Sequence, residues 1–347
     1  MKRQLRADDK DEASLLKGVL HLNLRKNSKV LVLSDLHLGL SRRDARSNVE
    51  DVVKLLRYVS EYIKPNWIIL LGDVLELWQA KAIRILESAY AFFRELFPID
   101  VSIVYVAGNH DRILAGISLK GFEHQKPLYI VPRYVLIRIN GKRVLALHGH
   151  QFDSLFTLTL GLWRLESFIY TLSESLISLP GLSEWLLSLI SAGVASLMMV
   201  VYYTFPLSFW TRLGLLIGSI LLVMPVIVLV WRYIQSELWY LVVMPLSLNM
   251  PFRRSRYRGL NEITSSRGFR KFLKSVERDF GRIDCLVFGH THVPGLRRIG
   301  NTVVVNSGGW ISERGRASGN AFVLIEDGSV KLFRWDEGPE KIGEERI

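Results

Sequence analysis

Val30-Leu-Val-Leu-Ser-Asp-Leu-His37 joins a run of four apolar residues to two candidate metal ligands, Asp35 and His37. A short, uninterrupted apolar run rich in β-branched residues is typical of a strand that is buried on both faces. The polar pair follows the run directly, so we expect it at the carboxyl end of that strand. Carboxylate and imidazole groups in this position are suited to binding a divalent metal ion.

Four further blocks repeat this arrangement of an apolar run followed by Asp, Asn or His. They are Gly72-Asp73 after Trp67–Leu71, Gly108-Asn109-His110-Asp111 after Val101–Val106, His148-Gly149-His150 after Val144–Leu147, and Gly289-His290-Thr291-His292 after Cys285–Phe288. In a layered α/β fold, the loops at the carboxyl edge of a sheet converge. The sequence therefore predicts that residues far apart in the chain share one site.

Strand-like and amphipathic segments alternate on both sides of a central insert. Amphipathic stretches occur at Val49–Ile63 and Ile83–Leu96, and short strands resume after Arg253. This pattern predicts an α/β domain of the α+β layered type. We expect it to comprise residues 29–153 and 253–347, with residues 1–28 as an N-terminal extension.

The insert, residues 154–252, has a different composition. Between Leu155 and Phe252 only seven residues are charged, and the spans at about 185–206 and 213–231 are almost entirely apolar. Each is long enough to cross a bilayer, which takes about 20 apolar residues. Two crossings return the chain to its starting side, as a site shared by His148 and His292 requires. The sequence predicts an all-α transmembrane or membrane-inserted hairpin, the alternative being a buried helical pair in a large soluble core.

Charge predicts the orientation of this hairpin. Arg212 stands alone in the turn, whereas Arg253, Arg254, Arg256 and Arg258 follow the second span. This difference places the α/β domain on the cytoplasmic face of the cell membrane. Arg253 and Arg254 serve either as a membrane-flanking anchor or in binding a diphosphate or head group. The net charge of +12 is compatible with nucleic acid, an acidic membrane face or phosphorylated substrates.

The donor types indicate the chemistry. Asp, Asn and His suit Mn²⁺ foremost, with Fe, Zn, Co or Ni as alternatives, and a shared carboxylate can hold two ions ~3.5–4 Å apart. Asp73 is the natural bridging residue. Paired ions activate a water and neutralise phosphoryl charge, so hydrolysis of a phosphoester or diphosphate is expected.

In this order and composition, the blocks resemble those of the calcineurin-like metallophosphoesterases. The resemblance implies a β-sandwich flanked by helices, with a site that contains two divalent metal ions. It also implies that His110 contacts the phosphate and protonates the leaving oxygen, while Asp111 orients the His110 imidazole. The ligands that it implies are Asp35, His37 and His292 for one metal, Asn109, His148 and His290 for the other, and Asp73 for both.

A closer resemblance is to the UDP-2,3-diacylglucosamine diphosphatase branch. It rests on Gly72-Asp-Val-Leu-Glu76-Leu-Trp78, His148-Gly-His-Gln-Phe-Asp153, Gly289-His-Thr-His-Val-Pro294 and Trp310. That branch cleaves the diphosphate of a nucleotide-linked lipid at the membrane surface and has a helical lid in the interval where this chain has its insert. Glu76, Trp78 and His150 are then candidate substrate-binding residues, although Glu76 and Trp78 could equally be packing residues and His150 could support a ligand histidine. The enterobacterial enzymes carry Gly-Asn-Arg-Asp and His-Gly-Asp where this chain has His110 and His150.

These observations favour a membrane-anchored phosphohydrolase with two metal ions that acts on a nucleotide-linked or phosphorylated lipid. The expected partners are this lipid substrate and the membrane, without nucleic acid or an obligate protein partner. One alternative is a nuclease or soluble-nucleotide phosphodiesterase, which a basic surface would suit. Another is a non-catalytic scaffold with a phosphoesterase-like fold.

Overall fold

The computed structural model describes residues 11–16, 19–77, 80, 82–111, 114, 128–152, 182–238, 259–313 and 319–347. The chain divides into two compact units. One contains Met1–Leu160 together with Arg253–Ile347, and the other contains Gly161–Phe252.

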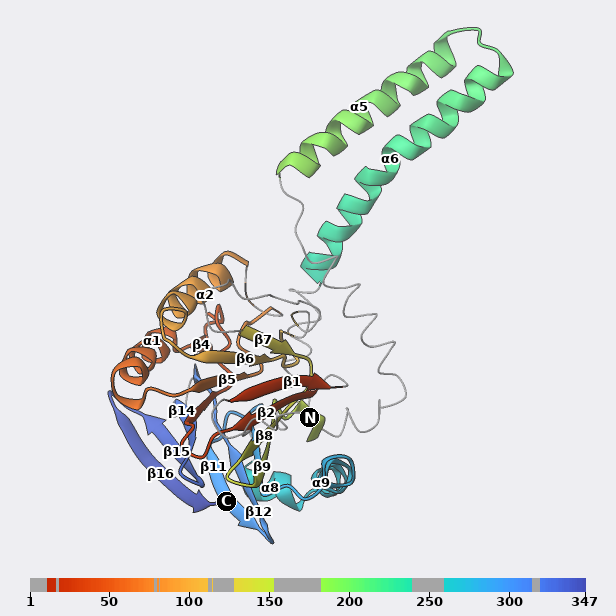
Figure 1. Ribbon diagram of the computed structural model, residues 1–347. Coiled ribbons are helices and arrows are strands. Elements are labelled where there is room, and N and C mark those ends of the chain that lie inside the picture. Colours follow the sequence, from red (N-terminus) through yellow and green to blue (C-terminus); the bar gives the residue numbers. More distant parts are fainter. Residues whose placement is uncertain are drawn as a thin grey trace, which may run out of the picture. The chain divides into compact units, whose positions relative to one another are not determined.

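Two seven-stranded sheets form the framework of the first unit (Figure 1). The strand order of the first sheet is β1 (Glu12–Leu16), β2 (Val19–Leu24), β8 (Tyr134–Ile139), β9 (Lys142–Leu147), β10 (Cys285–Phe288), β12 (Thr302–Asn306) and β11 (Gly295–Ile299). The order of the second is β16 (Pro339–Arg346), β15 (Ser329–Trp335), β14 (Ala321–Glu326), β3 (Val30–Leu33), β5 (Trp67–Leu71), β6 (Ser102–Val106) and β7 (Leu128–Val131). A short pair, β4 (Ala45–Ser47) and β13 (Ile311–Glu313), lies outside both.

Strand β3 shows why its sequence is apolar throughout. Val30 and Val32 belong to the core cluster between the two sheets, whereas Leu31 and Leu33 belong to the cluster beneath the helices. Both faces of the strand are therefore buried. Helices α1 (Val49–Tyr58) and α2 (Ala82–Leu96), with the π-helical turn η1 (Val59–Ile63), cover the second sheet, and α8 (Leu260–Ser265) and α9 (Arg267–Phe280) cover the first.

The predicted fold class, a β-sandwich flanked by helices, is confirmed. The turn at Asn140-Gly141, which joins β8 to β9, has left-handed backbone at both residues, with φ of 52° and 71°. Asn and Gly tolerate this conformation better than other residues, and turns of this kind match the twist of paired strands. The dipeptide Asn140-Gly141 is thus the turn sequence that a tight hairpin of this kind favours.

The second unit contains two antiparallel helices, α5 (Leu182–Thr204) and α6 (Phe209–Leu238). The segments Trp185–Thr204 and Phe209–Trp231 are long and apolar enough to cross a membrane, and most of their side chains are exposed. The turn between them is shorter than expected from the sequence, because α6 begins before Arg212. The Ser208 hydroxyl accepts a hydrogen bond from the Thr211 N–H at 3.3 Å and so caps its first turn.

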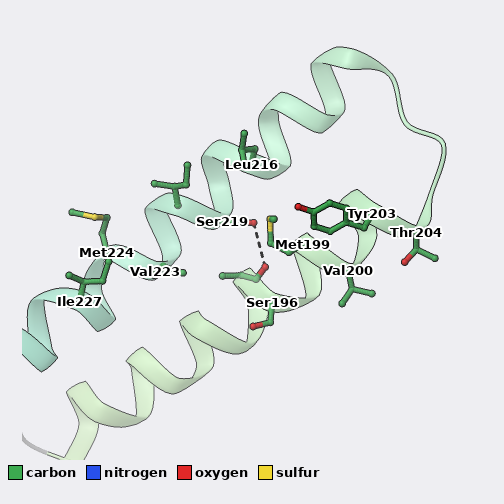
Figure 2. Close-up of a pocket in the computed structure, with 12 residues that line it drawn as sticks. Ser196, Met199, Val200, Tyr203, Thr204, Leu216, Ser219, Val223, Met224 and Ile227 are labelled. Atoms are coloured by element: carbon green, nitrogen blue, oxygen red, sulfur yellow. Dashed lines mark hydrogen bonds between the residues drawn. The ribbon is translucent and has the colours of Figure 1, made fainter.

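Small residues line the seam between α5 and α6. Ser188, Ala195 and Ser219 are buried there, and the Ser191 hydroxyl donates to the Leu222 carbonyl across the seam at 2.7 Å. Large side chains, including Met199, Leu216 and Ile227, line a groove between the helices (Figure 2). In this groove the Ser219 hydroxyl donates to the Ala195 carbonyl at 3.4 Å. Close backbone approach through small residues is the packing typical of helices in a bilayer.

Residues 12–24 correct the expectation of an N-terminal extension. They form β1 and β2, and β2 pairs in parallel with β8 inside the first sheet. The alternating sequence Val19-Leu-His-Leu-Asn-Leu24 explains this position, because Leu20, Leu22 and Leu24 all face the core between the sheets. Period-two alternation of this kind is a strand signal that the mixed charge of residues 1–17 obscured.

Leu22→Ala should destabilise the first unit by about 2–5 kcal/mol, because it leaves a cavity in the core between the sheets. The matched control is the neighbouring exposed residue on the same strand, Asn23→Ala, whose effect should stay within about 0.5 kcal/mol. Urea unfolding in detergent, followed by tryptophan fluorescence, measures both. Equal effects would contradict the placement of this strand in the core.

Candidate metal centre

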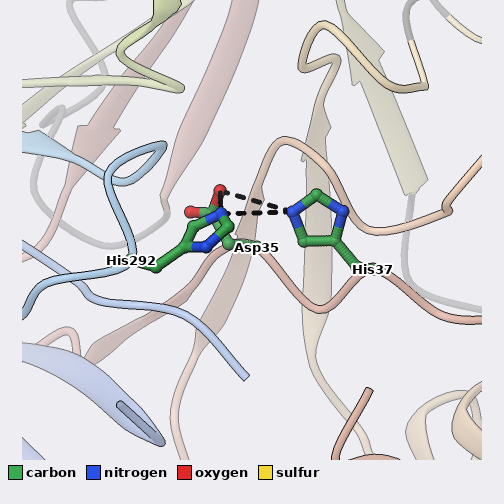
Figure 3. Close-up of side chains that lie close together, drawn as sticks. All are labelled: Asp35, His37 and His292. Atoms are coloured by element: carbon green, nitrogen blue, oxygen red, sulfur yellow. Dashed lines mark hydrogen bonds and ion pairs between the residues drawn. The ribbon is translucent and has the colours of Figure 1, made fainter. Parts of the chain in front are cut away.

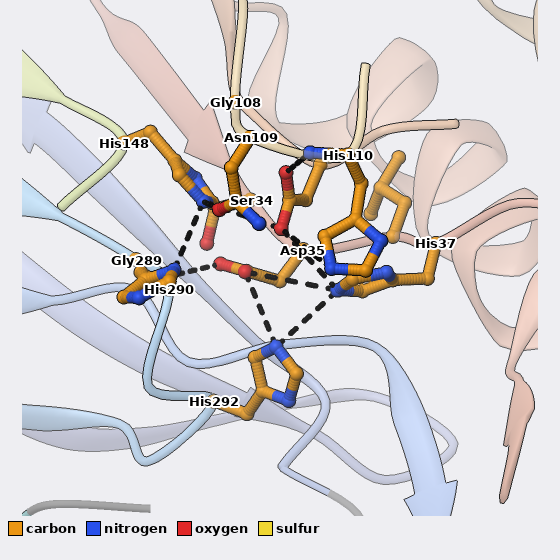
Figure 4. A network of polar contacts seen from close by, with 12 residues as sticks. Ser34, Asp35, His37, Gly108, Asn109, His110, His148, Gly289, His290 and His292 are labelled. Carbon is orange, nitrogen blue, oxygen red and sulfur yellow. Dashed lines mark hydrogen bonds and ion pairs between the residues drawn. The ribbon is translucent and has the colours of Figure 1, made fainter. Parts of the chain in front are cut away.

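The five sequence blocks meet at one edge of the sandwich (Figure 4). Asp35 follows β3, Asp73 follows β5 and Asn109 follows β6 in the second sheet, while His148 follows β9 and His290 follows β10 in the first. Strands β3, β5 and β6 run parallel, as do β9 and β10, so their carboxyl ends lie on the same side of each sheet. The structure thus brings together the residues predicted as metal ligands.

Tight turns aim these side chains at one another. The turns place five ligand candidates in the left-handed region, with φ between 43° and 70°: Asp35, His37, Asp73, His290 and His292. This conformation is unfavourable for residues with a Cβ and persists only where the surroundings enforce it. Its concentration at one edge of the sandwich indicates a functional site.

Two glycines allow the turns to approach each other. A Cβ on Gly108 would collide with the Asp73 carboxylate, and a Cβ on Gly289 would collide with that of Asp35. Neither glycine has positive φ, so the requirement is for space rather than for an unusual backbone. Each glycine belongs to one block and makes room for the carboxylate of another.

The first ligand group contains Asp35, His37 and His292 (Figure 3). Asp35 Oδ2 accepts a hydrogen bond from the His290 backbone N–H at 2.8 Å. The other oxygen, Oδ1, is buried without a hydrogen-bond partner among the described residues and lies 3.3 Å from His292 Nε2. His37 Nε2 lies 3.3 Å from His292 Nε2 and 3.9 Å from Asp35 Oδ1. One carboxylate oxygen is therefore held in place, and the other is directed at two imidazoles.

The second group contains Asp73, His148 and His290, with Asn109 beside it. His148 Nε2 lies 3.3 Å from Asp73 Oδ2, 3.1 Å from Asn109 Oδ1 and 3.2 Å from His290 Nδ1. Asp73 Oδ1 accepts the His110 backbone N–H at 2.8 Å, while Oδ2 is also 3.8 Å from His37 Nε2. Asp73 Oδ2 thus lies between the two groups, which is the position required of a bridging ligand.

Hydrogen bonds on the outer ring nitrogens set the histidine tautomers. His148 Nδ1 donates to the Leu71 carbonyl at 3.0 Å, and His37 Nδ1 donates to Glu76 at 2.7 Å. In both rings Nε2 then faces the ligand groups. Lone pairs on N and O that face each other at 3.1–3.3 Å repel unless a proton or a cation lies between them. This donor set fits divalent metal ions.

The electrostatics of the site lead to the same conclusion. Burial raises the pKa of Asp73, but the neighbouring His148 and His110 outweigh burial and hold that pKa well below its usual value. Burial lowers the pKa of His148, while the charge of Asp73 and a hydrogen bond to it raise it to about 10. The carboxylates therefore favour positive charge beside them at this position.

Glu76 lies between two of the site's histidines. It is only 1% exposed, and its two oxygens accept from His37 Nδ1 and His110 Nδ1, both at 2.7 Å. Burial raises its pKa, but these two histidines outweigh burial and keep it below its usual value. His37, Glu76 and His110 could also be considered a third metal-binding group, yet both carboxylate oxygens are already engaged by ring N–H donors. The structure therefore shows Glu76 orienting two histidines, and its candidate role as a substrate ligand stays a prediction.

Asp111 also has a different role from the one expected. Its Oδ1 accepts the Gly108 N–H at 2.6 Å, and its Oδ2 accepts the Val74 N–H at 2.7 Å and the Tyr105 hydroxyl at 2.6 Å. The carboxylate therefore fixes the loops of Asp73 and Asn109, while Glu76 binds the His110 ring. The sequence analysis did not identify Tyr105, because it lies within an apolar strand segment. Its hydroxyl was the only feature that could have indicated a polar role.

The remaining candidates divide into placed and undescribed residues. His150 is buried in the short 3-10 turn η3 (His150–Phe152), with its ring 5.5 Å from that of His148 and 6.4 Å from that of His290. Trp310 is fully buried, and its backbone N–H donates to the Asp35 carbonyl at 2.9 Å. Trp78, Arg253 and Arg254 lie outside the described residues.

Comparisons with solved structures found distant similarity to several proteins. YfcE, a phosphoesterase from E. coli, is 11% identical, with 92% of this chain and 99% of that chain covered and a TM-score of 0.39. Vacuolar protein sorting 29 from Cryptosporidium parvum is 12% identical, with coverages of 93% and 100% and a TM-score of 0.38. GAP50 of Plasmodium, described as the anchor in the inner membrane complex, is 10% identical, with coverages of 93% and 89% and a TM-score of 0.42. None of the curated proteins compared with the chain matches it.

A family model gives the more specific result. Residues 28–178 match the model described as calcineurin-like phosphoesterase. This segment contains β3, β5, β6 and β9 and, with them, the blocks of Asp35, Asp73, Asn109 and His148. Together with the two-sheet sandwich and the clustered ligands, the match shows that the chain contains a calcineurin-like metallophosphoesterase domain.

Proposed function

We propose that this protein is a membrane-anchored phosphohydrolase with two divalent metal ions that cleaves a phosphoester or diphosphate of a nucleotide-linked or phosphorylated lipid. The main observation behind the proposal is the position of Asp73 Oδ2. It lies 3.3 Å from His148 Nε2 and 3.8 Å from His37 Nε2, one from each ligand group. A buried carboxylate shared in this way is what a pair of metal ions requires.

The residues divide into two sets of ligands. Asp35, His37 and His292 would hold one ion, and Asn109, His148 and His290 the other, with Asp73 common to both. Two bound ions would supply a water of lowered pKa and neutralise negative charge on the phosphoryl oxygens. Mn²⁺ is our first candidate, and the same donors accept Fe, Zn, Co or Ni.

His110 is the proposed proton donor to the leaving oxygen. Its Nδ1 is bound by Glu76, so its Nε2 faces the ligand cluster at 4.0 Å from Asp73 Oδ2. An imidazole whose outer nitrogen is hydrogen-bonded to a carboxylate is held in one orientation and is stabilised when it carries a proton. Glu76 would therefore orient a ligand, His37, and the acid, His110, at the same time.

The insert supports a lipid substrate and a membrane location. The helices α5 and α6 expose large apolar side chains along most of their length, and small residues lie buried in the seam between them. A helical hairpin of this kind would anchor the domain at a bilayer, where lipid phosphates are available. The resemblance to the UDP-2,3-diacylglucosamine diphosphatase branch suggests a nucleotide-lipid diphosphate, and the arginines after the insert suggest the cytoplasmic face.

The decisive experiment compares substrates. The purified protein in detergent with Mn²⁺ should release a nucleoside monophosphate from UDP-linked or CDP-linked lipids in preference to cleaving a soluble chromogenic phosphodiester. Asp73→Asn should lower both rates by more than about a hundredfold without unfolding the protein. Replacing residues 155–252 by a short linker should leave turnover of the soluble ester and remove the preference for lipid. Cleavage of the soluble ester or of nucleic acid alone would refute the lipid assignment, and bound metal without turnover of any phosphoester would favour a scaffold.

Glu76→Gln should reduce both Mn²⁺ affinity and kcat/KM by roughly 10–100-fold, because an amide oxygen can accept from only one of the two ring N–H groups. The matched control is Glu87→Gln on the exposed face of α2, which should change neither quantity. Equilibrium dialysis and initial rates over a range of pH measure the two effects. Unchanged values in the Glu76 variant would exclude the orienting role.

Metal loading at pH 8 should release about one proton per protein, because the raised pKa of His148, about 10, keeps Nε2 protonated until a metal replaces the proton. The release should persist at each pH below this value and decline as pH rises through it. Calorimetric titration with Mn²⁺ in two buffers of different ionisation enthalpy measures the proton count. Identical heats in the two buffers would contradict this assignment.

A further inference from the structure

Helix α9 carries a basic stripe along its exposed side, which we define as Arg267, Arg270, Lys271, Lys274 and Arg278. These positions recur at intervals of three and four residues, so they occupy an arc of about 100° on the helix. Phe269 and Val276, on the opposite side, are buried against the first sheet. The apolar side of α9 therefore packs against the first sheet, and the basic stripe on the other side faces solvent.

Carboxylates do not neutralise most of this stripe. Arg270 donates to the Ser265 carbonyl at 3.2 Å, and Arg278 lies 3.7 Å from Asp279. Within the described part of the chain, Arg267, Arg270, Lys271 and Lys274 have no carboxylate within ion-pair distance. Five cations in one row, with one carboxylate partner among them, form a strong local positive field that favours an anionic partner.

The chain enters and leaves the insert close to α9. Phe152, the last described residue before the insert, has its ring 5.3 Å from that of Phe269 and 5.0 Å from that of Phe272. Gly259, the first described residue after the insert, is the N-cap of α8, and α8 is followed directly by α9. Two segments, 153–181 and 239–258, therefore connect this part of the first unit to the apolar hairpin.

We propose that the basic stripe of α9 binds the anionic lipid head groups of the bilayer that holds the α5–α6 hairpin. This inference rests on the membrane anchoring in the proposed function. Anchoring keeps α9 near the lipid surface, at a high effective concentration. Electrostatic attraction to anionic lipid that would be too weak to bind a free protein then suffices to hold α9 at the surface. The electrostatic contribution would hold the domain against the head groups, within reach of a lipid phosphate.

The chemistry of the stripe favours lipid over nucleic acid. Single-stranded nucleic acids bind to grooves in which aromatic side chains stack on the bases. The aromatic residues of α9, Phe269, Phe272 and Phe280, face the first sheet instead. A row of Arg and Lys without an exposed aromatic residue suits a surface of phosphate head groups, because binding to such a surface requires positive charge and no stacking.

A labelled full-length protein tests the proposal. Ser265→Cys places a thiol at the end of α8, two residues before α9 begins. The native Cys285 is buried, and burial raises its pKa, so a fluorophore reacts at the new site only. The protein is reconstituted into vesicles of phosphatidylcholine with or without about 30% phosphatidylglycerol, each containing a head-group quencher. Quenching should be about threefold stronger or more in the anionic vesicles, and roughly 1 M NaCl, which shortens the screening length to about 3 Å, should abolish the difference.

Matched variants separate the stripe from net charge. Changing Arg267, Arg270, Lys271 and Lys274 to Gln should remove the difference in quenching. Changing the exposed Lys26, Arg43, Lys54 and Lys64 to Gln lowers the net charge equally and should preserve it. Resistance of the protein to extraction by alkaline carbonate reports on the hairpin separately, so a failure of anchoring is distinguished from a failure of the stripe. Equal quenching in neutral and anionic vesicles by an anchored protein would overturn the proposal, as would stripe-dependent binding of RNA or DNA oligomers without lipid dependence.

Discussion

The constraint on which the structure depends is the close approach of buried carboxylates and imidazoles at one edge of the sandwich. Two carboxylates and several imidazoles converge there within 3.1–4.0 Å, an arrangement that would be repulsive if the groups were free to move apart. The backbone N–H of His290 fixes Asp35, and that of His110 fixes Asp73. Each carboxylate is therefore held by the turn of a different block, so no block can shift without displacing the ligand of another.

This mutual support between the blocks explains why the strands that carry them are buried and apolar. Left-handed turns and crowded ligands cost free energy, and only a rigid framework can maintain them. Strands β3, β5 and β10 provide it, because they are buried along their whole length between helices and the facing sheet. The same crowding leaves little room for exchange: Gly108 and Gly289 make room for carboxylates that any side chain in their places would displace.

Much of this could be predicted from the sequence, because each ligand block directly follows an apolar run. A strand end is a local property, and convergence at one sheet edge follows from parallel topology. The roles of Glu76 and Asp111 could not be predicted, because both depend on which loop lies beside which in three dimensions. The N-terminal strands were missed for a different reason: Leu20, Leu22 and Leu24 alternate clearly, but a highly charged segment precedes them.

The position of the insert follows from the same constraint. It separates His148 from His290 and His292, which must nevertheless meet in one site. A single long helix would carry the chain about 30 Å away for every 20 residues, whereas two antiparallel helices return it to where it left. The last described residue before the insert, Phe152, contacts α9, and the first one after it, Gly259, caps α8. The chain therefore leaves and re-enters the domain at the same pair of helices. An even number of long helices is therefore the arrangement that lets an apolar insert of this size interrupt the domain without separating its ligands.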